Sequence, residues 1–193
     1  MIAKRIIYCW FGGEKPQKVL DCMKTWKEKL PDWELLEINE SNFDIHYNKF
    51  VEEAYKNKKY AFVSDVARLW ALYEYGGVYM DTDVIVNKNL DIFLGYDFFT
   101  GFEQPYYPVT AVMGSVKNNM LIREMLEVYN NKEFKVQDDW TKYETNTMIM
   151  SDVIGKYFDR YNDRLQEKNN MAIYPSNIFC KGDYTKHLMT GMW

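Results

Sequence analysis

The sequence predicts an α/β fold in which a mixed, mostly parallel sheet is flanked by helices, as in Rossmann-like proteins. The continuous apolar run 6–11 stops at a Gly-Gly pair, as expected for a buried parallel strand. Apolar residues then follow Pro16 on one face of a predicted helix: Val19, Leu20, Met23, Trp26 and Leu30. A second apolar run at 33–38 completes a strand, helix, strand unit, which requires a parallel sheet.

The middle of the chain continues the alternation of helices and strands. A short helix is predicted at 50–55 and a longer one at 61–75, which Gly76 ends because a helix terminus often needs a left-handed residue. A strand at 78–80 is then expected to run through Asp81-Thr82-Asp83 into an extended segment at 84–86. Further strands are predicted at 98–102, 110–113 and 172–174, helices at 121–129 and 147–158, and a polar, mobile loop at 130–143.

Composition favours a single folded domain over residues 1–193. Hydrophobic residues make up 47% of the chain, which excludes a mainly disordered protein. The net charge of -4 provides no basic surface for nucleic acid. Three cysteines without metal-ligand spacing, and no apolar run of about 20 residues, point to a reducing cytoplasm and at most peripheral membrane association.

Asp81 and Asp83 interrupt an apolar stretch, and such carboxylates are costly to bury without a compensating cation. In an extended chain both side chains would face one side. Hard oxygen ligands of this kind suit Mg²⁺ or Mn²⁺, completed by waters and substrate phosphates. The alternative, a turn or a helix cap, also uses aspartate.

A pair of oppositely charged residues, Asp65 and Arg68, precedes the two aspartates on the predicted helix 61–75. Asp65 and Arg68 are neighbours on one helix face, and a solvated surface ion pair is the simplest interpretation of them in isolation. The whole stretch from Ser64 to Asp83, a helix, a double glycine, a strand and an acid pair, is more distinctive than either pair alone.

This stretch closely resembles the DXD-containing sugar-binding region of a glycosyltransferase family. The family includes bacterial capsular polysaccharide enzymes, yeast-type initiating mannosyltransferases and the large clostridial glucosylating toxins. The opening segment 7–13 is similar to the family's first strand, and the stronger part of the resemblance covers about 6–86. The resemblance implies a GT-A type fold, a metal-dependent hexosyltransferase and transfer of the sugar with retention.

The resemblance also assigns roles to residues of this sequence. Trp10 would stack on the nucleotide base, while Ser64, Asp65 and Arg68 would hold the ribose or donor sugar and Tyr79 would line the same pocket. Asp81 would contact the ribose, the sugar or a metal-bound water, and Asp83 would ligate the metal. Physical chemistry agrees, since a metal on a diphosphate acts as a Lewis acid towards the leaving group, and Arg68 can donate to its oxygens.

Two C-terminal residues are further candidates. His187 stands where related transferases complete the metal shell, although a lone histidine is more commonly a satisfied structural residue. Trp193 resembles a terminal tryptophan near the donor phosphates. Met192 replaces the usual serine before it, so either a ligand is absent or the chain continues further. No nucleophile is assigned, because nothing in the sequence places Glu103 or Asp183 at the reacting carbon.

Two other functions remain open at this point. A phosphatase of the haloacid dehalogenase class would use Asp81 as nucleophile and Asp83 as acid and base. A module that binds a sugar nucleotide without turnover would keep the same pocket. The resemblance favours the transferase, with a nucleoside-diphosphate sugar as donor, UDP-sugar ahead of GDP-sugar. It implies a saccharide or lipid-linked oligosaccharide acceptor in capsular or exopolysaccharide synthesis at the inner face of a bacterial membrane.

Overall fold

The fold is organised around one large sheet and one small one. The structure, a computed structural model, describes residues 1–104 and 107–191. The large sheet has seven strands in the order β2-β1-β3-β6-β5-β8-β7, and the small sheet pairs β4 with β9. In chain order the strands are β1 (Arg5–Cys9), β2 (Glu34–Ile38), β3 (Gly77–Met80), β4 (Val84–Val86), β5 (Phe98–Gln104), β6 (Tyr107–Ser115), β7 (Gln166–Lys168), β8 (Met171–Tyr174) and β9 (Thr185–His187).

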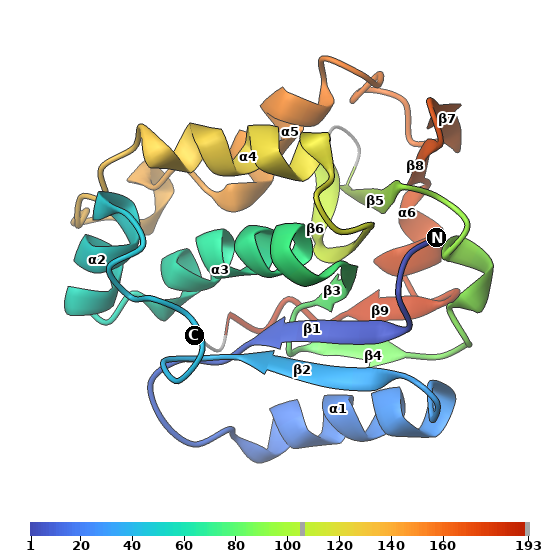
Figure 1. Cartoon of the computed structure of the whole chain (residues 1–193), viewed down its shortest axis with the longest axis horizontal. Coiled ribbons are helices and arrows are strands. Elements are labelled where there is room, and N and C mark those ends of the chain that lie inside the picture. Colours follow the sequence, from blue (N-terminus) through green and yellow to red (C-terminus); the bar gives the residue numbers. More distant parts are fainter. Residues whose placement is uncertain (105–106, 192–193) are drawn as a thin grey trace.

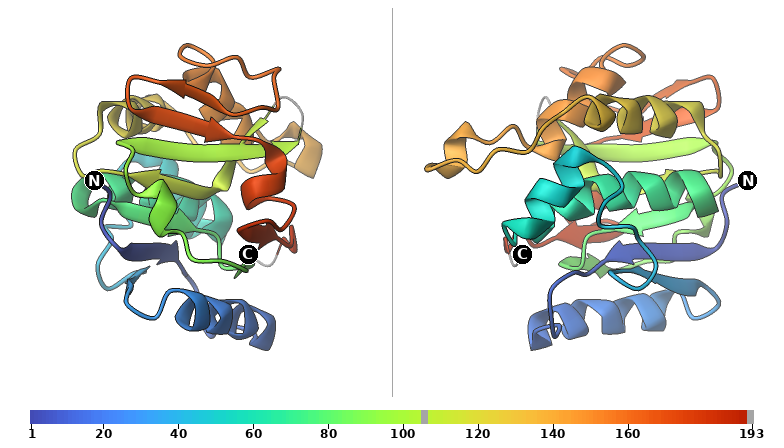
Figure 2. Two further views of the ribbon diagram at one scale, coloured as in Figure 1. Left: turned by 90° about the vertical axis from the view of Figure 1, so that its right-hand side faces the viewer. Right: turned by 60° about the vertical axis from the view of Figure 1, so that its left-hand side comes forward.

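The large sheet is mixed, with most of its strands in one direction. β1 pairs in parallel with β2 and β3, and β5 pairs in parallel with β8. β6 and β7 are antiparallel to their neighbours. Figure 2 shows the sheet passing from the blue N-terminal strands to β8 and β7 at the opposite edge. The predicted α/β class is confirmed.

Helices cover both faces of this sheet. They are α1 (Gln17–Lys29), α2 (Lys49–Lys56), α3 (Tyr60–Tyr75), α4 (Met120–Asn130), α5 (Asn146–Ile154) and α6 (Ser176–Phe179), with 3-10 turns at Asp91–Phe93 and Trp140–Lys142. Alternate side chains of β1 separate two cores: Ile7 and Cys9 pack with α2 to α5, while Ile6 and Tyr8 pack with α1. α1 and α3 accordingly lie on opposite sides of β1 and β2 (Figure 1). None of the helices in the described residues is long and apolar enough to cross a bilayer.

Two details of the predicted helices were wrong. Leu20 of α1 is 45% exposed, because the helix buries a narrow stripe formed by Val19, Cys22 and Trp26. α5 ends at Ile154, not at residue 158, since Gly155 has a low helix propensity and the chain continues in turns.

The segment around the aspartate pair also differs from its prediction. The chain does not stay extended from β3 into β4: a turn, closed by the Val84 amide donating to the Asp81 carbonyl at 3.1 Å, sends β4 into the small sheet. The polar stretch 130–143 carries two aromatic side chains, Phe134 and Tyr143, that pack into the core against Phe62. Strands β7 and β9 and helix α6 had not been predicted.

Gly76 places β3 directly after α3. Its φ of 66° and ψ of 160° lie in a region that side chains disfavour, and a Cβ there would lie 2.7 Å from the Lys117 backbone nitrogen. We expect Gly76→Ala to lower the free energy of unfolding by about 1–3 kcal/mol, measured by urea denaturation. The control is Gly95→Ala, because a Cβ at Gly95 meets nothing within 4 Å. Equal stabilities of the two variants would contradict this account of the α3–β3 junction.

Candidate active site

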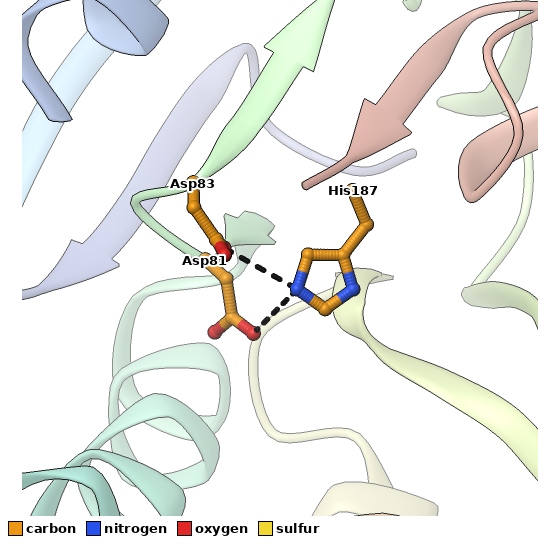
Figure 3. Close-up of side chains that lie close together, drawn as sticks. All are labelled: Asp81, Asp83 and His187. Carbon is orange, nitrogen blue, oxygen red and sulfur yellow. Dashed lines mark ion pairs between the residues drawn. The ribbon is translucent and has the colours of Figure 1, made fainter. Parts of the chain in front are cut away.

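The Asp-Thr-Asp segment forms a buried turn at the end of β3. Asp81 is 5% exposed and Asp83 1% exposed. The turn, rather than the alternation of a strand, directs both carboxylates to the same side (Figure 3). Two buried carboxylates this close in sequence require positive charge or hydrogen-bond donors around them.

The small sheet brings His187 to these carboxylates. In the pairing of β4 with β9, Val84 lies opposite His187, and the Leu188 amide donates to the Asp83 carbonyl at 3.1 Å. The His187 Nε2 atom lies 3.3 Å from Asp83 Oδ1 and 4.0 Å from Asp81 Oδ2. Figure 3 shows the same ring nitrogen facing both acids. The structure therefore assembles the three residues predicted as metal ligands.

Two residues that had not been assigned a role hold this group in place. The other ring nitrogen of His187, Nδ1, lies 3.0 Å from Oε1 of Glu103 on β5. The backbone amide and the hydroxyl of Thr190 donate to Asp83 Oδ2 at 2.8 and 2.9 Å. Asp83 Oδ1 is buried and accepts no hydrogen bond from the described residues. The His187 Nε2 atom, 3.3 Å away, is its partner in an ion pair.

The surroundings determine the protonation of His187 and Asp83. Burial lowers the pKa of His187, but its contacts with Asp83 and Glu103 outweigh burial and raise this pKa to about 10. Burial raises the pKa of Asp83, but its interactions with His187 and Thr190 lower it to about 2. The imidazolium of His187 therefore supplies positive charge next to the carboxylates in the metal-free protein.

Arg68 joins the turn to helix α3. Its side chain is 5% exposed, with Nη1 3.2 Å from Asp81 Oδ1 and Nη2 3.0 Å from Asp65 Oδ1. Asp65 and Arg68 are thus a buried pair, and the interpretation as a solvated surface pair was wrong. Asn146 of α5 also donates to Asp65 Oδ1, at 3.1 Å. Burial nevertheless raises the pKa of Asp65 to about 6, against the opposing effect of Arg68.

Tyr79 lies behind this network rather than on its surface. The guanidinium carbon of Arg68 is 4.6 Å from the Tyr79 ring centroid, and the Tyr79 hydroxyl donates to Asp81 Oδ1 at 2.6 Å. Tyr79 is only 1% exposed, so in this structure it orients Arg68 and Asp81. Ser64, 6% exposed, accepts a hydrogen bond from Arg68 Nε at its carbonyl.

A cavity of about 380 Å³ opens over the assembled residues. Its polar lining includes Asp65, Arg68, Asp81, Glu103, Asn146 and His187. Ser64 and Tyr79 are absent from its described lining. The cavity thus combines carboxylates, a buried guanidinium and an imidazole, a set able to hold a cation, phosphate oxygens and sugar hydroxyls.

Of the two tryptophans predicted at the site, the structure describes Trp10. Trp10 follows β1, whose pairing with β3 places it at the same sheet edge as the Asp81 turn. It is half-buried, its indole donates to the Gly13 carbonyl at 2.8 Å, and it does not line the cavity. Trp193 lies outside the described residues.

The three ligand residues suit a divalent metal ion. One potential ligand atom from each of Asp81, Asp83 and His187 lies within 4.8 Å of the others. The buried Asp83 Oδ1 accepts no hydrogen bond from the described residues and has His187 Nε2 3.3 Å away, so a cation held by both residues would compensate its charge. Two carboxylates and an imidazole match the preferences of Mn²⁺, and the carboxylates also suit Mg²⁺.

Comparison with solved structures defines the class of fold. The chain superposes on a structure titled PaToxG Glycosyltransferase with a TM-score of 0.59 and 18% identity, covering 80% of this chain and 69% of that one. A glycosyltransferase involved in glycosylation of the major capsid of PBCV-1 gives a TM-score of 0.57 and 14% identity, covering 96% and 93%. The fold is therefore that of GT-A glycosyltransferases, as expected.

Sequence comparison then shows which proteins the chain resembles. Residues 16–99 match the model described as "Glycosyltransferase sugar-binding region containing DXD motif". The chain is 31% identical to inositol phosphoceramide mannosyltransferase 3 of Schizosaccharomyces pombe over 65% of its own length and 36% of that protein. It is 30% identical to an uncharacterised glycosyltransferase of Acanthamoeba polyphaga mimivirus, over 79% of its own length and 64% of that protein. Residues 16–99 of the chain are thus similar to this DXD-motif glycosyltransferase family, and the chain spans less than two thirds of both relatives.

Proposed function

We propose that this chain transfers a sugar from a nucleoside-diphosphate sugar to a saccharide acceptor and depends on a divalent metal ion. The observation that carries the proposal is the grouping of Asp81, Asp83 and His187 next to a cavity that Asp81, His187 and Arg68 line. Asp83 and His187 would hold the metal, with Asp81 as a further ligand or as the acceptor of a metal-bound water. A metal there supplies Lewis-acid stabilisation of the negative charge that develops on the departing diphosphate.

The remaining residues of the cavity have roles that follow from their contacts. Arg68 is fixed between two acids and a tyrosine ring, so it is preorganised to donate to an oxygen of the donor. Asp65 and Asn146 provide an acceptor and a donor for sugar hydroxyls. Trp10, at the same sheet edge, is available to stack on the base.

The donor and the stereochemistry are inferred from the family resemblance. We favour a UDP-sugar over a GDP-sugar, and retention at the anomeric carbon, on the family resemblance of 64–83. The fission-yeast relative is named a mannosyltransferase, so GDP-mannose belongs among the donors to be tested. The name of this relative also mentions inositol phosphoceramide, which is a lipid. A lipid in the name supports a lipid-linked acceptor and peripheral membrane association for this chain. Capsular or exopolysaccharide synthesis in a bacterial cytoplasm is the corresponding biological setting.

The test is turnover. Incubation with Mn²⁺ and a panel of UDP-sugars and GDP-mannose should release nucleoside diphosphate from at least one of these donors. Without an acceptor the release should be slow, because water then takes the place of the acceptor. Release of inorganic phosphate from phosphomonoesters would instead identify the phosphatase alternative. Tight donor binding without any turnover would identify a non-catalytic module.

Glu103 should influence the metal through His187. Its carboxylate accepts from, or pairs with, His187 Nδ1 and so fixes the ring with Nε2 towards the acids. Partners of this kind typically change metal affinity 10–100-fold when removed. We expect Glu103→Gln to weaken Mn²⁺ binding by about tenfold in calorimetric titration. Exposed Glu127→Gln is the control, and unchanged affinity in Glu103→Gln would contradict the positioning role.

A further inference from the structure

A second cavity adjoins the one that contains Asp81 and His187. Its volume is about 300 Å³, and the two cavities share Glu103, Thr145 and Thr147. Tyr107, at the start of β6, and Met148, on α5, line the second cavity alone. A molecule bound there would therefore lie next to the proposed donor site and would contact the same three shared residues.

The side chains of the second cavity suit a sugar ring. Tyr107 is 38% exposed and Met148 47% exposed, so both present apolar surface to the solvent. Thr145 and Thr147 add hydroxyls beside them. A sugar ring has an apolar face of C–H groups and an edge of hydroxyls, and aromatic side chains with polar neighbours provide the complementary surface.

Charge argues against a phosphate in the same place. Among the described residues that line the second cavity, Glu103 is the one with a charged side chain, and none is a lysine or arginine. A carboxylate repels phosphate, whereas it accepts hydrogen bonds from neutral hydroxyls. The second cavity is thus unsuited to the donor diphosphate and suited to an uncharged saccharide.

Glu103 connects the two cavities. Its Oε1 atom is engaged by His187, and Oε2 has no hydrogen-bond partner among the residues described. The Glu103 side chain retains 20% exposure, enough for contact with a ligand. A hydroxyl donating to Oε2 would lie beside His187 and the proposed metal site.

From these observations we infer that the second cavity is the acceptor subsite, which binds an uncharged saccharide unit against Tyr107 and Met148 with a hydroxyl on Glu103. The inference rests on the proposed function, since it assigns the acceptor within that transfer reaction. Tyr107 is a specificity-determining platform rather than a catalytic residue.

The test uses a panel of methyl hexosides, those of glucose, galactose and mannose in both anomeric forms, as probes. Saturation-transfer NMR with the full chain, Mg²⁺ and UDP or GDP should detect at least one of them. Tyr107→Ala should raise its Kd on the order of tenfold and Met148→Ala severalfold, while Tyr107→Phe keeps the ring and the affinity. Tyr161→Ala and Met120→Ala, at exposed residues away from the cavity, should leave it unchanged.

Nucleotide affinity, titrated on the same variants, separates this inference from the proposed function. We expect UDP or GDP to bind Tyr107→Ala as it binds the wild type. Absence of hexoside binding, or binding that neither substitution weakens, would overturn the acceptor subsite while leaving the donor site intact. Loss of nucleotide affinity in Tyr107→Ala would overturn it as well, because the cavity would then serve the donor. Failure of nucleotide to bind the wild type would refute the proposed function itself, whereas hexoside binding that depends on Tyr107 would still support the saccharide site.

Discussion

Asp83→Asn is expected to reduce turnover of the donor by at least about 100-fold and to abolish measurable Mn²⁺ binding. The substitution keeps the shape of the side chain but replaces one carboxylate oxygen by an amide, which removes the charge of a proposed metal ligand. Asp83 is 1% exposed and is held by Thr190, so no other acid can swing into its position without rearranging the turn. Nucleoside-diphosphate release and Mn²⁺ titration measure the two effects.

A matched control separates loss of the ligand from a general effect of charge. Asp183 is exposed and accepts a hydrogen bond from Asn177 near the C-terminal end of the chain. Asp183→Asn should leave turnover and Mn²⁺ affinity within about twofold of wild type. If Asp83→Asn retained full Mn²⁺ affinity with a native circular dichroism spectrum, the metal-ligand assignment of Asp83 would be wrong.

Arg68→Met is expected to lower the free energy of unfolding by about 3–5 kcal/mol. Arg68 is the buried partner of both Asp65 and Asp81, and removing one member of a buried ion pair leaves uncompensated charge in a region of low dielectric. Methionine has a similar volume and is apolar, so the loss arises mainly from charge rather than from a cavity. Urea denaturation in EDTA, without metal, is the appropriate measurement.

Two further variants make this result interpretable. Arg123→Met removes an exposed arginine paired with Glu127 within α4, and should change stability by less than about 0.5 kcal/mol. Adding Asp65→Asn to Arg68→Met removes one of the unpaired carboxylates and should recover part of the loss. Equal free energies of unfolding for Arg68→Met and Arg123→Met would contradict the view that Arg68 neutralises buried acids.

Much of the fold follows from local patterns in the sequence. The apolar run that forms β1, the amphipathic helix after Pro16 and the run that forms β2 are each identified by periodicity, and together they imply a parallel pair. Gly76 has the positive φ that its place after a helix predicted. Local patterns thus predicted a parallel sheet, whereas its mixed character was implied by the resemblance to GT-A glycosyltransferases.

The C-terminal part of the site could not be predicted in the same way. β9 is three residues long with the sequence Thr-Lys-His, so it has no apolar alternation, and it is stabilised by pairing with β4. Thr190 reaches Asp83 across 107 residues of sequence. Contacts of this kind depend on the completed fold, and the position of His187 came from family resemblance alone.

The sequence indicates the burial of Asp65 and Arg68, but only when their apolar neighbours on the helix are considered together with the pair. Apolar residues surround them on all sides of α3, including Phe62, Val66 and Leu69, and a helix that is apolar all round is a buried helix. Charged residues on such a helix must find partners inside the protein. In this chain Arg68 pairs with Asp65 and Asp81, and Asn146 donates to Asp65. All four residues line the cavity.

Asp81, Asp83 and His187 are proposed to hold a cation that binds the donor diphosphate. Calorimetric titration of the wild type with UDP and with GDP, in EDTA and then in Mn²⁺, tests this proposal. We expect Mn²⁺ to strengthen binding of at least one nucleotide by about tenfold or more, and Asp83→Asn to remove this gain. Nucleotide binding of equal strength with and without Mn²⁺ would contradict it.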